Sequence, residues 1–271
     1  MLRRATARPG PLLVADLFAG AGVYDLAASR ARTTGEAEAG IGRLLAAADP
    51  LPELVAPLVE RVRALDPAGR LYPGSPELAR GMLREGDRLL LVELHPSDAA
   101  ALVARYRGLP GVEIRRQDGY RLLARTLPQP GRRAVVLIDP AYELEGEEAR
   151  AVEALGRAVA RQPAAVYLLW YPVLERARSE AFLEALAGVG LGGALRVELG
   201  VLPDGAARGL TASGMLLLNA PRGLDRWLAR ELPALAALLG ARGPCLVARL
   251  QGRPAARRTR PPGRSLSGAP R

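Results

Sequence analysis

The sequence predicts an α/β fold: a Rossmann-like, doubly wound sheet with a small helical insertion. Three observations support this prediction. Short apolar runs alternate with longer amphipathic segments, a glycine-rich turn follows the first run, and later runs end on acidic residues. Strands that alternate with helices favour a parallel sheet that is covered by helices on both faces. The chain has 271 residues, 49% of them hydrophobic, so it can bury a sizeable core.

The apolar runs are interpreted as the strands of this sheet. The first strand, residues 12–18, leads into Gly20 and Gly22, which permit a tight turn and a close approach of the backbone to a ligand. The later strands are predicted at residues 88–94, 112–117, 133–139, 164–170, 194–201, 215–219 and 245–250.

Helices are predicted where apolar side chains recur at steps of three and four residues. A helix is expected to begin in residues 24–30, and the helical insertion spans about 36–71, divided by Asp49-Pro50-Leu51-Pro52. Ser75 is predicted to cap a helix through about Arg84, with Pro76 at its first position. Further helices are expected at residues 97–106, 119–126, 147–161, 175–188 and 224–239.

The composition predicts one domain and a tail. Residues 1–250 are expected to form the domain, and residues 251–271 a disordered tail that is rich in Pro and contains six arginines and no acid. The chain carries a net charge of +10. A basic surface suits a nucleic-acid partner, although an arginine-biased composition explains the same charge.

Cysteine, histidine and hydropathy exclude several classes of protein. Cys245 is the only cysteine and His95 the only histidine, so an internal disulfide and a multi-cysteine zinc site are excluded, and no metal is expected. No apolar run reaches the roughly 18 residues that span a bilayer, and the first residues lack a signal-peptide core. We therefore expect a cytoplasmic protein that has no membrane partner.

Two acids follow the glycine turn at the ends of successive strands. Asp25 stands where a dinucleotide fingerprint requires its third glycine, which disfavours a nicotinamide oxidoreductase and favours S-adenosylmethionine as the ligand. Glu93 ends the second strand and can accept hydrogen bonds from both ribose hydroxyls of the ligand. Asp118 ends the third strand and can accept a hydrogen bond from the adenine amine. Without the glycine turn, Glu93 would be interpreted as a solvated acid at a strand end, and Asp118 alone as a turn residue.

The fourth strand ends in Asp139-Pro140-Ala141-Tyr142. A carboxylate and the Pro140 carbonyl can hold both N–H bonds of an exocyclic amine, which leaves the nitrogen lone pair free to attack a methyl group. Tyr142 offers a face for stacking a flipped base. A plain Asp-Pro turn is the competing interpretation.

Two other segments can be interpreted as either functional or structural. His95 suggests a general base, but a local structural contact explains it more simply. Trp170-Tyr171-Pro172 suits either a wall of the substrate site or core packing.

Together these segments resemble the bacterial 23S ribosomal RNA adenine-N6 methyltransferases that act at adenine 2030. The likeness covers roughly Leu12 to Pro221 and includes Tyr72-Pro73-Gly74-Ser75-Pro76 and Leu210-Thr211-Ala212-Ser213-Gly214-Met215. It implies a class I methyltransferase fold, S-adenosylmethionine as cofactor, 23S RNA, naked or partly assembled, as partner, and a monomer. The implied site comprises a catalytic Asp139, substrate contacts at Pro140 and Tyr142, and cofactor contacts at Phe18, Gly20, Gly22, Ser75, Glu93, Asp118 and Gly119.

The chain departs from the family pattern in three places. Only residues 1–11 precede the first strand, without the family's Tyr-, His- and Lys-containing opening segment; Phe18 replaces a histidine, and Ala141 replaces the second proline of Asp-Pro-Pro-Tyr. These departures keep open the alternative of a non-catalytic RNA-binding relative. A DNA adenine-N6 methyltransferase, which uses the same amine chemistry, is a second alternative.

Overall fold

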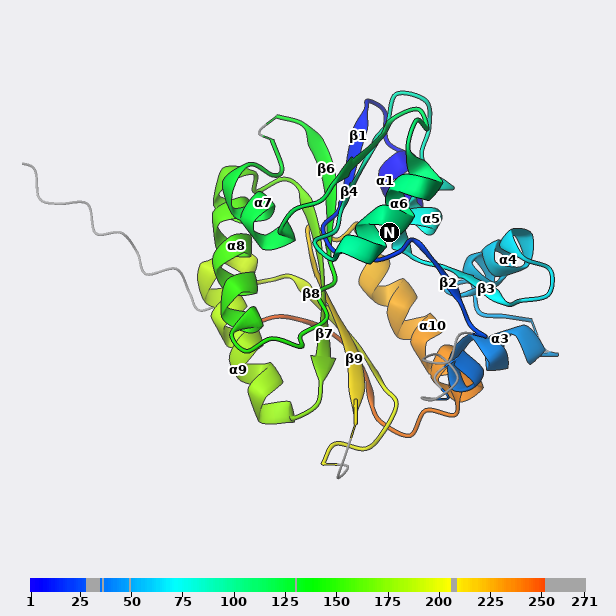
Figure 1. Cartoon of the computed structure of the whole chain (residues 1–271). Helices are drawn as coiled ribbons and strands as arrows, with labels where there is room; N and C mark the ends of the chain where they lie inside the picture. Colours follow the sequence, from blue (N-terminus) through cyan, green and yellow to red (C-terminus); the bar gives the residue numbers. More distant parts are fainter. Residues whose placement is uncertain (28–34, 36, 49, 130, 206–208, 252–271) are drawn as a thin grey trace, which may run out of the picture.

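The main sheet of the computed structural model has eight strands in the order β10-β8-β9-β7-β6-β1-β4-β5 (Figure 1). The structure describes residues 1–27, 35, 37–48, 50–129, 131–205 and 209–251. The strands are β1 (Leu12–Asp16), β4 (Arg88–Val92), β5 (Val112–Arg115), β6 (Arg133–Ile138), β7 (Val166–Val173), β8 (Leu195–Gly200), β9 (Ala212–Leu218) and β10 (Cys245–Arg249). Each strand of the main sheet was predicted, and the α/β fold is confirmed.

The sheet is mixed. Strands β5, β4, β1, β6 and β7 pair in parallel, whereas β7–β9, β9–β8 and β8–β10 are antiparallel pairs. Strand β7 extends three residues beyond its predicted end and includes Pro172. Its pairing with β6 stops at Leu169, so Pro172 lies where no β6 acceptor needs an N–H donor.

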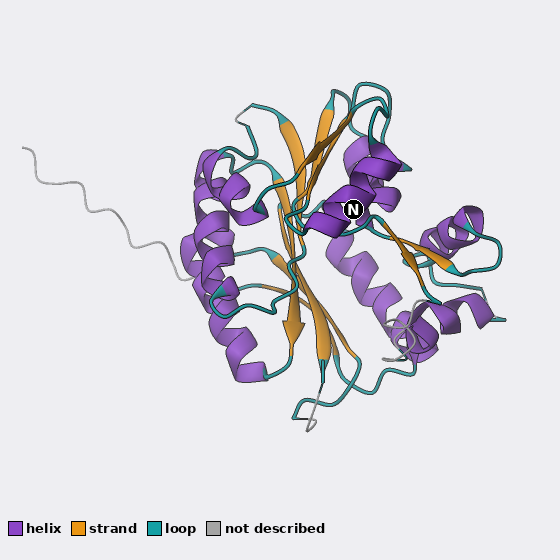
Figure 2. Ribbon diagram, viewed as in Figure 1, coloured by secondary structure: helices purple, strands orange, loops and turns teal. Residues whose placement is uncertain are grey.

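Helices cover both faces of the sheet (Figure 2). One face carries α7 (Gly119–Arg125), α8 (Glu147–Arg161), α9 (Arg176–Leu186) and the short π-helix η2 (Ala187–Leu191). The other carries α1 (Leu2–Thr6), which was not predicted, α5 (Ser75–Arg80), α6 (Pro96–Tyr106) and α10 (Leu224–Leu239).

Strand β4 shows why both layers are stable. Leu89 and Leu91 pack on the α5–α6 side, and Leu90 and Val92 on the α7–α8 side, because successive side chains of a strand point to opposite faces. All four side chains are buried. Each buried aliphatic side chain of this size contributes about 1.5–3 kcal/mol.

A second, small sheet precedes α5. Strand β2 (Val23–Asp25) pairs antiparallel with β3 (Leu71–Pro73), and between them lie the π-helix η1 (Glu38–Gly42), α3 (Arg43–Ala46) and α4 (Ala56–Leu65). The expected helix start at residues 24–30 is therefore wrong for residues 24 and 25; residues 28–30 lie outside the described part. The Asp25 carboxylate accepts from Arg70 Nε at 2.9 Å, which ties β2 to the residue before β3.

The segment between β2 and β3 packs on α10. Ile41, Leu44, Val59 and Val62 form a cluster with Leu235 of α10. Two other details differ from prediction: Gly74, not Ser75, occupies the N-cap of α5, and α5 ends at Arg80 rather than near Arg84. Of the expected tail, residues 251–271, all but residue 251 lie outside the described part. No helix within the described ranges is both long and apolar enough to cross a membrane.

Candidate active site at the carboxyl edge of the sheet

The predicted site residues lie at one edge of the sheet, around the point where the strand order reverses. From β1 the chain continues to β4 and β5 on one side, and then to β6 and β7 on the other. The carboxyl ends of these parallel strands carry Gly20, Glu93, Asp118 and Asp139. A crevice at such a switch point is where open α/β sheets bind ligands.

The glycine turn after β1 is held against β4. Gly20 and Gly22 have φ values of +56° and +81°, which disfavour residues that have a side chain. The Gly20 N–H donates to Glu93 Oε2 at 2.9 Å. A Cβ on Gly22 would lie 2.7 Å from the buried Tyr106 ring. The turn is therefore fixed by both its backbone and its packing.

The same turn positions Ser75. The Gly74 N–H donates to the Gly22 carbonyl at 2.9 Å, so the start of α5 lies beside the end of β1. Although Ser75 does not cap this helix, its side chain faces the Asp16 carboxylate.

Glu93 is oriented by two backbone donors. Besides the Gly20 N–H, the His95 N–H donates to Glu93 Oε1 at 2.7 Å. Each carboxylate oxygen keeps a further lone pair that can accept a ligand hydroxyl. The His95 ring is exposed, with Nδ1 2.9 Å from Ser97 Oγ. Local contact, the simpler interpretation of His95, agrees with this position.

Asp118 caps α7 and pairs with an arginine from α8. Its Oδ1 accepts from the Arg121 N–H at 3.1 Å, and its Oδ2 pairs with the Arg150 guanidinium. That guanidinium also lies 4.8 Å from the centroid of the Tyr120 ring, within range of a cation–π interaction. Sequence reasoning missed Arg150, because it lies far along the chain from Asp118 and no spacing links the two.

Gly119 is required by packing. A Cβ at this position would lie 2.3 Å from the Leu17 carbonyl oxygen. The start of α7 therefore lies directly against the end of β1. Leu94, Gln117, Asp118 and Leu122 line a hollow of about 470 Å³ next to this contact.

Asp16, the last residue of β1, is a second residue that sequence reasoning left out of the site. It is 1% exposed, and its Oδ2 has no hydrogen-bond partner among the described residues. The pKa of Asp16 is raised to about 7: burial is the largest cause and the carboxylates of Asp139 and Glu93 add to it, while Ser75 and the Phe18 N–H oppose the shift. Asp16, Glu93 and Asp139 therefore lie near enough to influence one another electrostatically. The sequence offered one signal for Asp16, which is that this acid ends an apolar run.

Asp139 follows β6, the neighbour of β1. Its surface is exposed, yet the surrounding protein desolvates the carboxylate enough to raise the pKa to about 6. Pro140 is buried behind it. The Asp139 carboxylate is thus accessible to solvent but partly desolvated by the protein. It therefore ionises at a higher pH than an ordinary aspartate.

Aromatic residues follow the strands whose ends carry these carboxylates. Tyr142 has a φ of +54°, and its hydroxyl donates to the Trp170 carbonyl at 2.9 Å. Burial raises the pKa of Tyr142 above its usual range. The Phe18 ring packs edge-on against Tyr120, with centroids 4.8 Å apart. Tyr171 is buried and donates to Glu198 at 2.7 Å, so core packing is the better interpretation of this residue.

Comparison with known proteins gives this geometry a family. The model of a family described as "Ribosomal RNA large subunit methyltransferase D, RlmJ" matches residues 9–248. The chain is 38% identical to ribosomal RNA large subunit methyltransferase J of Escherichia coli (strain K12) over 83% of this chain and 81% of that protein. It is also 38% identical to the protein of that name from Haemophilus influenzae, over 84% and 82%.

A solved structure agrees with these sequence matches. Protein LPL1258 from Legionella pneumophila is 27% identical and superposes with a TM-score of 0.82, over 93% of this chain and 92% of that one. The resemblance expected from the strand-end motifs is confirmed, and the chain belongs to the RlmJ family of ribosomal RNA large subunit methyltransferases.

Proposed function

We propose that this chain transfers a methyl group from S-adenosylmethionine to the N6 amine of an adenine in 23S ribosomal RNA. One observation carries the proposal: Asp139-Pro140-Ala141-Tyr142 ends β6 directly beside the glycine turn of β1, in a member of this methyltransferase family. The relatives are named as ribosomal RNA large subunit methyltransferases, which supports 23S RNA as the substrate.

The residues of the carboxyl edge fit the cofactor. S-adenosylmethionine is a sulfonium ion that supplies an electrophilic methyl group when bound. The carboxylates of Asp16, Glu93 and Asp139 lie at this edge, and the Oδ2 of Asp16 has no hydrogen-bond partner among the residues that the structure describes. Glu93 would accept hydrogen bonds from the ribose hydroxyls, and Asp118 one from the adenine amine. Gly20, Gly22 and Gly119 would allow the backbone to approach the cofactor closely. Ser75 and Phe18 would complete the contact.

Asp139 would hold the target amine. As a carboxylate it accepts one N–H bond, and the Pro140 carbonyl accepts the other, so the nitrogen lone pair is directed away from the ring. When Asp139 is protonated, one of its oxygens carries the proton, so both oxygens can no longer accept a hydrogen bond from the amine. Because its pKa is raised to about 6, Asp139 is ionised at neutral pH while remaining a better acceptor than a fully hydrated acid. Once methylated, the nitrogen loses its proton readily, so a strong base is not needed.

Tyr142 would stack on the flipped adenine. Its hydroxyl and ring are fixed against β7, with the Trp170 ring centroid 5.8 Å away, so the ring is held in place before substrate arrives. A base that stacks on a fixed aromatic ring loses less freedom at the moment of reaction.

We expect the protein to act as a monomer. A base that must enter a concave edge also has to be accessible, so we expect naked or partly assembled 23S RNA as the substrate. Ribosomal RNA of that kind is found in the cytoplasm, where we expect the protein to act.

The test is methyl transfer to a 23S RNA fragment, followed by nucleoside mass spectrometry. Asp139→Asn should lower the rate at least 100-fold and leave cofactor affinity within about threefold, because the lost interaction involves the reacting nitrogen. Glu85→Gln, a change at an exposed acid in the loop before β4, is the matched control. N6-methyladenine formed at the wild-type rate by Asp139→Asn would refute the mechanism.

The same assay separates the alternatives. A non-catalytic RNA-binding relative would retain RNA but bind no S-adenosylmethionine in calorimetry. A DNA methyltransferase would modify a DNA oligonucleotide of the same sequence faster than the RNA.

A further inference from the structure

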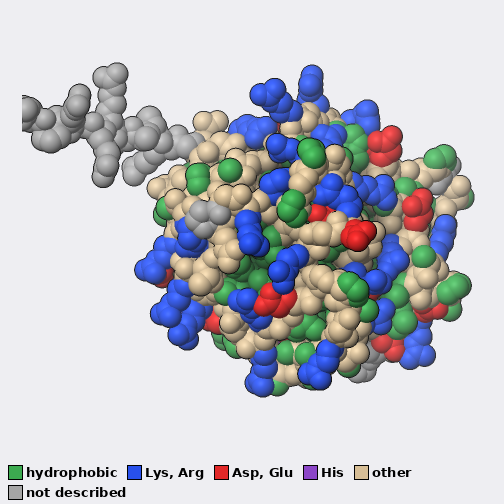
Figure 3. Space-filling model, turned by 90° about the horizontal axis from the view of Figure 1, so that it is seen from above, with side chains coloured by type: hydrophobic (Ala, Val, Ile, Leu, Met, Phe, Trp, Pro, Cys, Tyr) green, Lys and Arg blue, Asp and Glu red, His purple; other side chains and the backbone are tan. Residues whose placement is uncertain are grey.

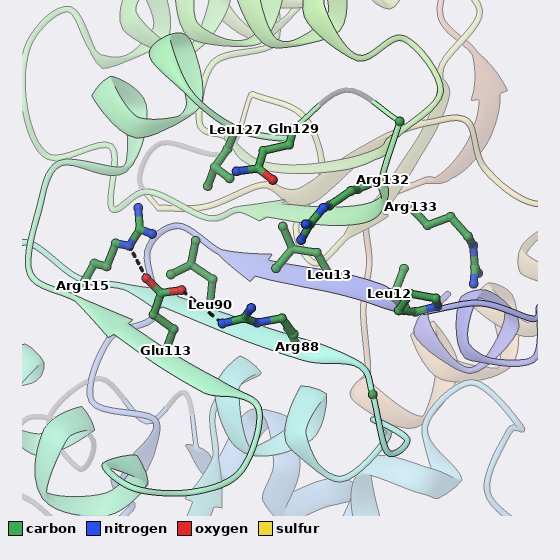
Figure 4. Close-up of a pocket in the computed structure, with 13 residues that line it drawn as sticks. Leu12, Leu13, Arg88, Leu90, Glu113, Arg115, Leu127, Gln129, Arg132 and Arg133 are labelled. Atoms are coloured by element: carbon green, nitrogen blue, oxygen red, sulfur yellow. Dashed lines mark hydrogen bonds and ion pairs between the residues drawn. The ribbon is translucent and has the colours of Figure 1, made fainter.

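A large hollow in the described part of the molecule lies away from the glycine turn, toward the amino ends of β1, β4 and β6. It has a volume of about 860 Å³ and lies over the first residues of β1, β4 and β6 and along β5 as far as its last residue, Arg115 (Figure 4). Helix α7 ends at Arg125, so it leaves this end of the sheet face uncovered. Leu13, Leu90 and Leu127 form an apolar floor.

The walls of the hollow are cationic. Arg88, Arg115 and Arg132 line it, against a single acid, Glu113. Figure 4 shows Glu113 between two of these arginines, with Oε1 2.6 Å from Arg115 Nε and Oε2 4.0 Å from Arg88. Arg132 forms no ion pair with any described residue. The hollow therefore keeps an excess of positive charge.

These arginines differ from others at the same end that hold the fold together. Arg133 donates to the carbonyls of Ala5, Pro9 and Gly10, and Arg84 to those of Arg8 and Gly10. Such guanidinium groups are already occupied. Seen from above in Figure 3, this end of the molecule carries many basic side chains and few acidic ones.

A basic surface continues from the hollow toward the methyl-transfer edge. Arg121 and Arg125 of α7 line the neighbouring hollow that also contains Asp118. The two hollows are lined by consecutive residues of the chain, Thr126 in one and Leu127 in the other. Arginines of β4, β5 and α7 thus line these two hollows, from Arg88 at the start of β4 to Arg121 in the first turn of α7.

We propose that the hollow and this α7 surface bind a single-stranded segment of the RNA substrate, remote from the target adenine. This inference rests on the proposed function. Guanidinium groups suit phosphate oxygens through paired N–H donors, and the leucine floor suits the face of a base or ribose. The volume lies in the range of pockets that hold one small ligand, which corresponds to about one or two nucleotides. The strand would then follow α7 toward the cofactor edge.

The test compares two triple variants by fluorescence anisotropy with the 23S RNA fragment. The hollow variant is Arg88→Gln, Arg115→Gln and Arg132→Gln. The control is Arg226→Gln, Arg230→Gln and Arg249→Gln, which removes equal charge from α10 and β10 at the far edge of the sheet. Affinity is measured at several salt concentrations. Cofactor affinity and melting temperature are measured for both variants.

We expect the hollow variant to bind RNA at least tenfold more weakly and the control less than threefold. The slope of log affinity against log salt should fall by about two for the hollow variant, since each phosphate contact on a single strand contributes roughly 0.7. Cofactor affinity should not change. Equal losses in the two variants, or wild-type binding by the hollow variant, would overturn the inference.

Two further measurements keep the result interpretable. If the triple variant fails to fold, Arg132→Gln alone provides the same comparison, because Arg132 forms no ion pair with any described residue. The slope of log affinity against log salt should then change by about 0.7. A mononucleotide that displaces the RNA at micromolar concentration would make the hollow a small-molecule site and would also overturn the inference. A wild-type protein that binds RNA but transfers no methyl group would refute the proposed function and leave this comparison intact.

Discussion

Replacing Asp16 by Asn removes a buried charge from the end of β1 and keeps the size of the side chain. Asp16 is 1% exposed, its Oδ2 has no partner among the described residues, and burial raises its pKa to about 7. At pH 8 the folded protein must therefore hold a poorly compensated carboxylate. The Asn variant carries no such charge at any pH.

The magnitude follows from the two pKa values. Raising the pKa from 3.8 to about 7 corresponds to about 4 kcal/mol, at 1.36 kcal/mol per unit. Because the pKa is higher in the folded state, the stabilising effect is complete below about pH 4 and is lost as the pH rises through 7. Roughly 2–3 kcal/mol of that loss falls between pH 5 and pH 8.

The assay is urea unfolding of both proteins at pH 5, 6, 7 and 8, without cofactor, followed by circular dichroism. The free energy of unfolding of Asp16→Asn, relative to wild type, should increase by about 2–3 kcal/mol from pH 5 to pH 8. The contributions of other titrating groups to the free energy of unfolding are the same in both proteins and cancel in this difference. Glu85→Gln, at an exposed acid, should give a flat difference. Parallel pH curves for Asp16→Asn and wild type would refute the assignment of a buried, raised-pKa carboxylate.

Three further results are expected at the carboxyl edge. Glu93→Gln should weaken S-adenosylmethionine binding in calorimetry by about 1–3 kcal/mol, because a charged acceptor is lost; unchanged affinity would remove Glu93 from the site. Tyr142→Phe should lower the free energy of unfolding by about 0.5–1.5 kcal/mol and slow methyl transfer without changing cofactor affinity, since it breaks the hydrogen bond to the Trp170 carbonyl; a wild-type rate would show that this anchor is not used. The single-turnover rate at saturating cofactor should be constant above about pH 7 and fall as Asp139 is protonated below pH 6; a rate that stays constant down to pH 5 would contradict this role.

The main sheet was predictable because each of its strands is a short apolar run between turns. A strand buried on both faces needs continuous hydrophobic sequence, and β4 and β6 have it. The strands β2 and β3 were not predictable in this way. Each has three residues, Tyr24 is 44% exposed, and the pairing depends on Arg70 reaching Asp25, which no local pattern reveals.

Part of the candidate site was predictable for a topological reason. The residues that end parallel strands share one edge, so Glu93, Asp118 and Asp139 could be assigned to it before their side chains were seen. Their partners could not be assigned. Arg150 reaches Asp118 from another helix, and the burial of Asp16 depends on packing around the end of β1. Both are tertiary facts that sequence periodicity does not encode.

Packing also accounts for two departures from the family pattern. Phe18, in place of a histidine, directs its ring onto Tyr120 and joins the apolar core, while its N–H still bonds to Asp16. Ala141, in place of a proline, is exposed and precedes a residue in the left-handed conformation. That conformation costs a non-glycine residue roughly 1–2 kcal/mol. The Tyr142 hydroxyl bond to β7 and its ring contacts with Trp170 and Phe182 offset this cost. The rigidity of the loop therefore comes from Tyr142, and the loop can keep its shape without the second proline.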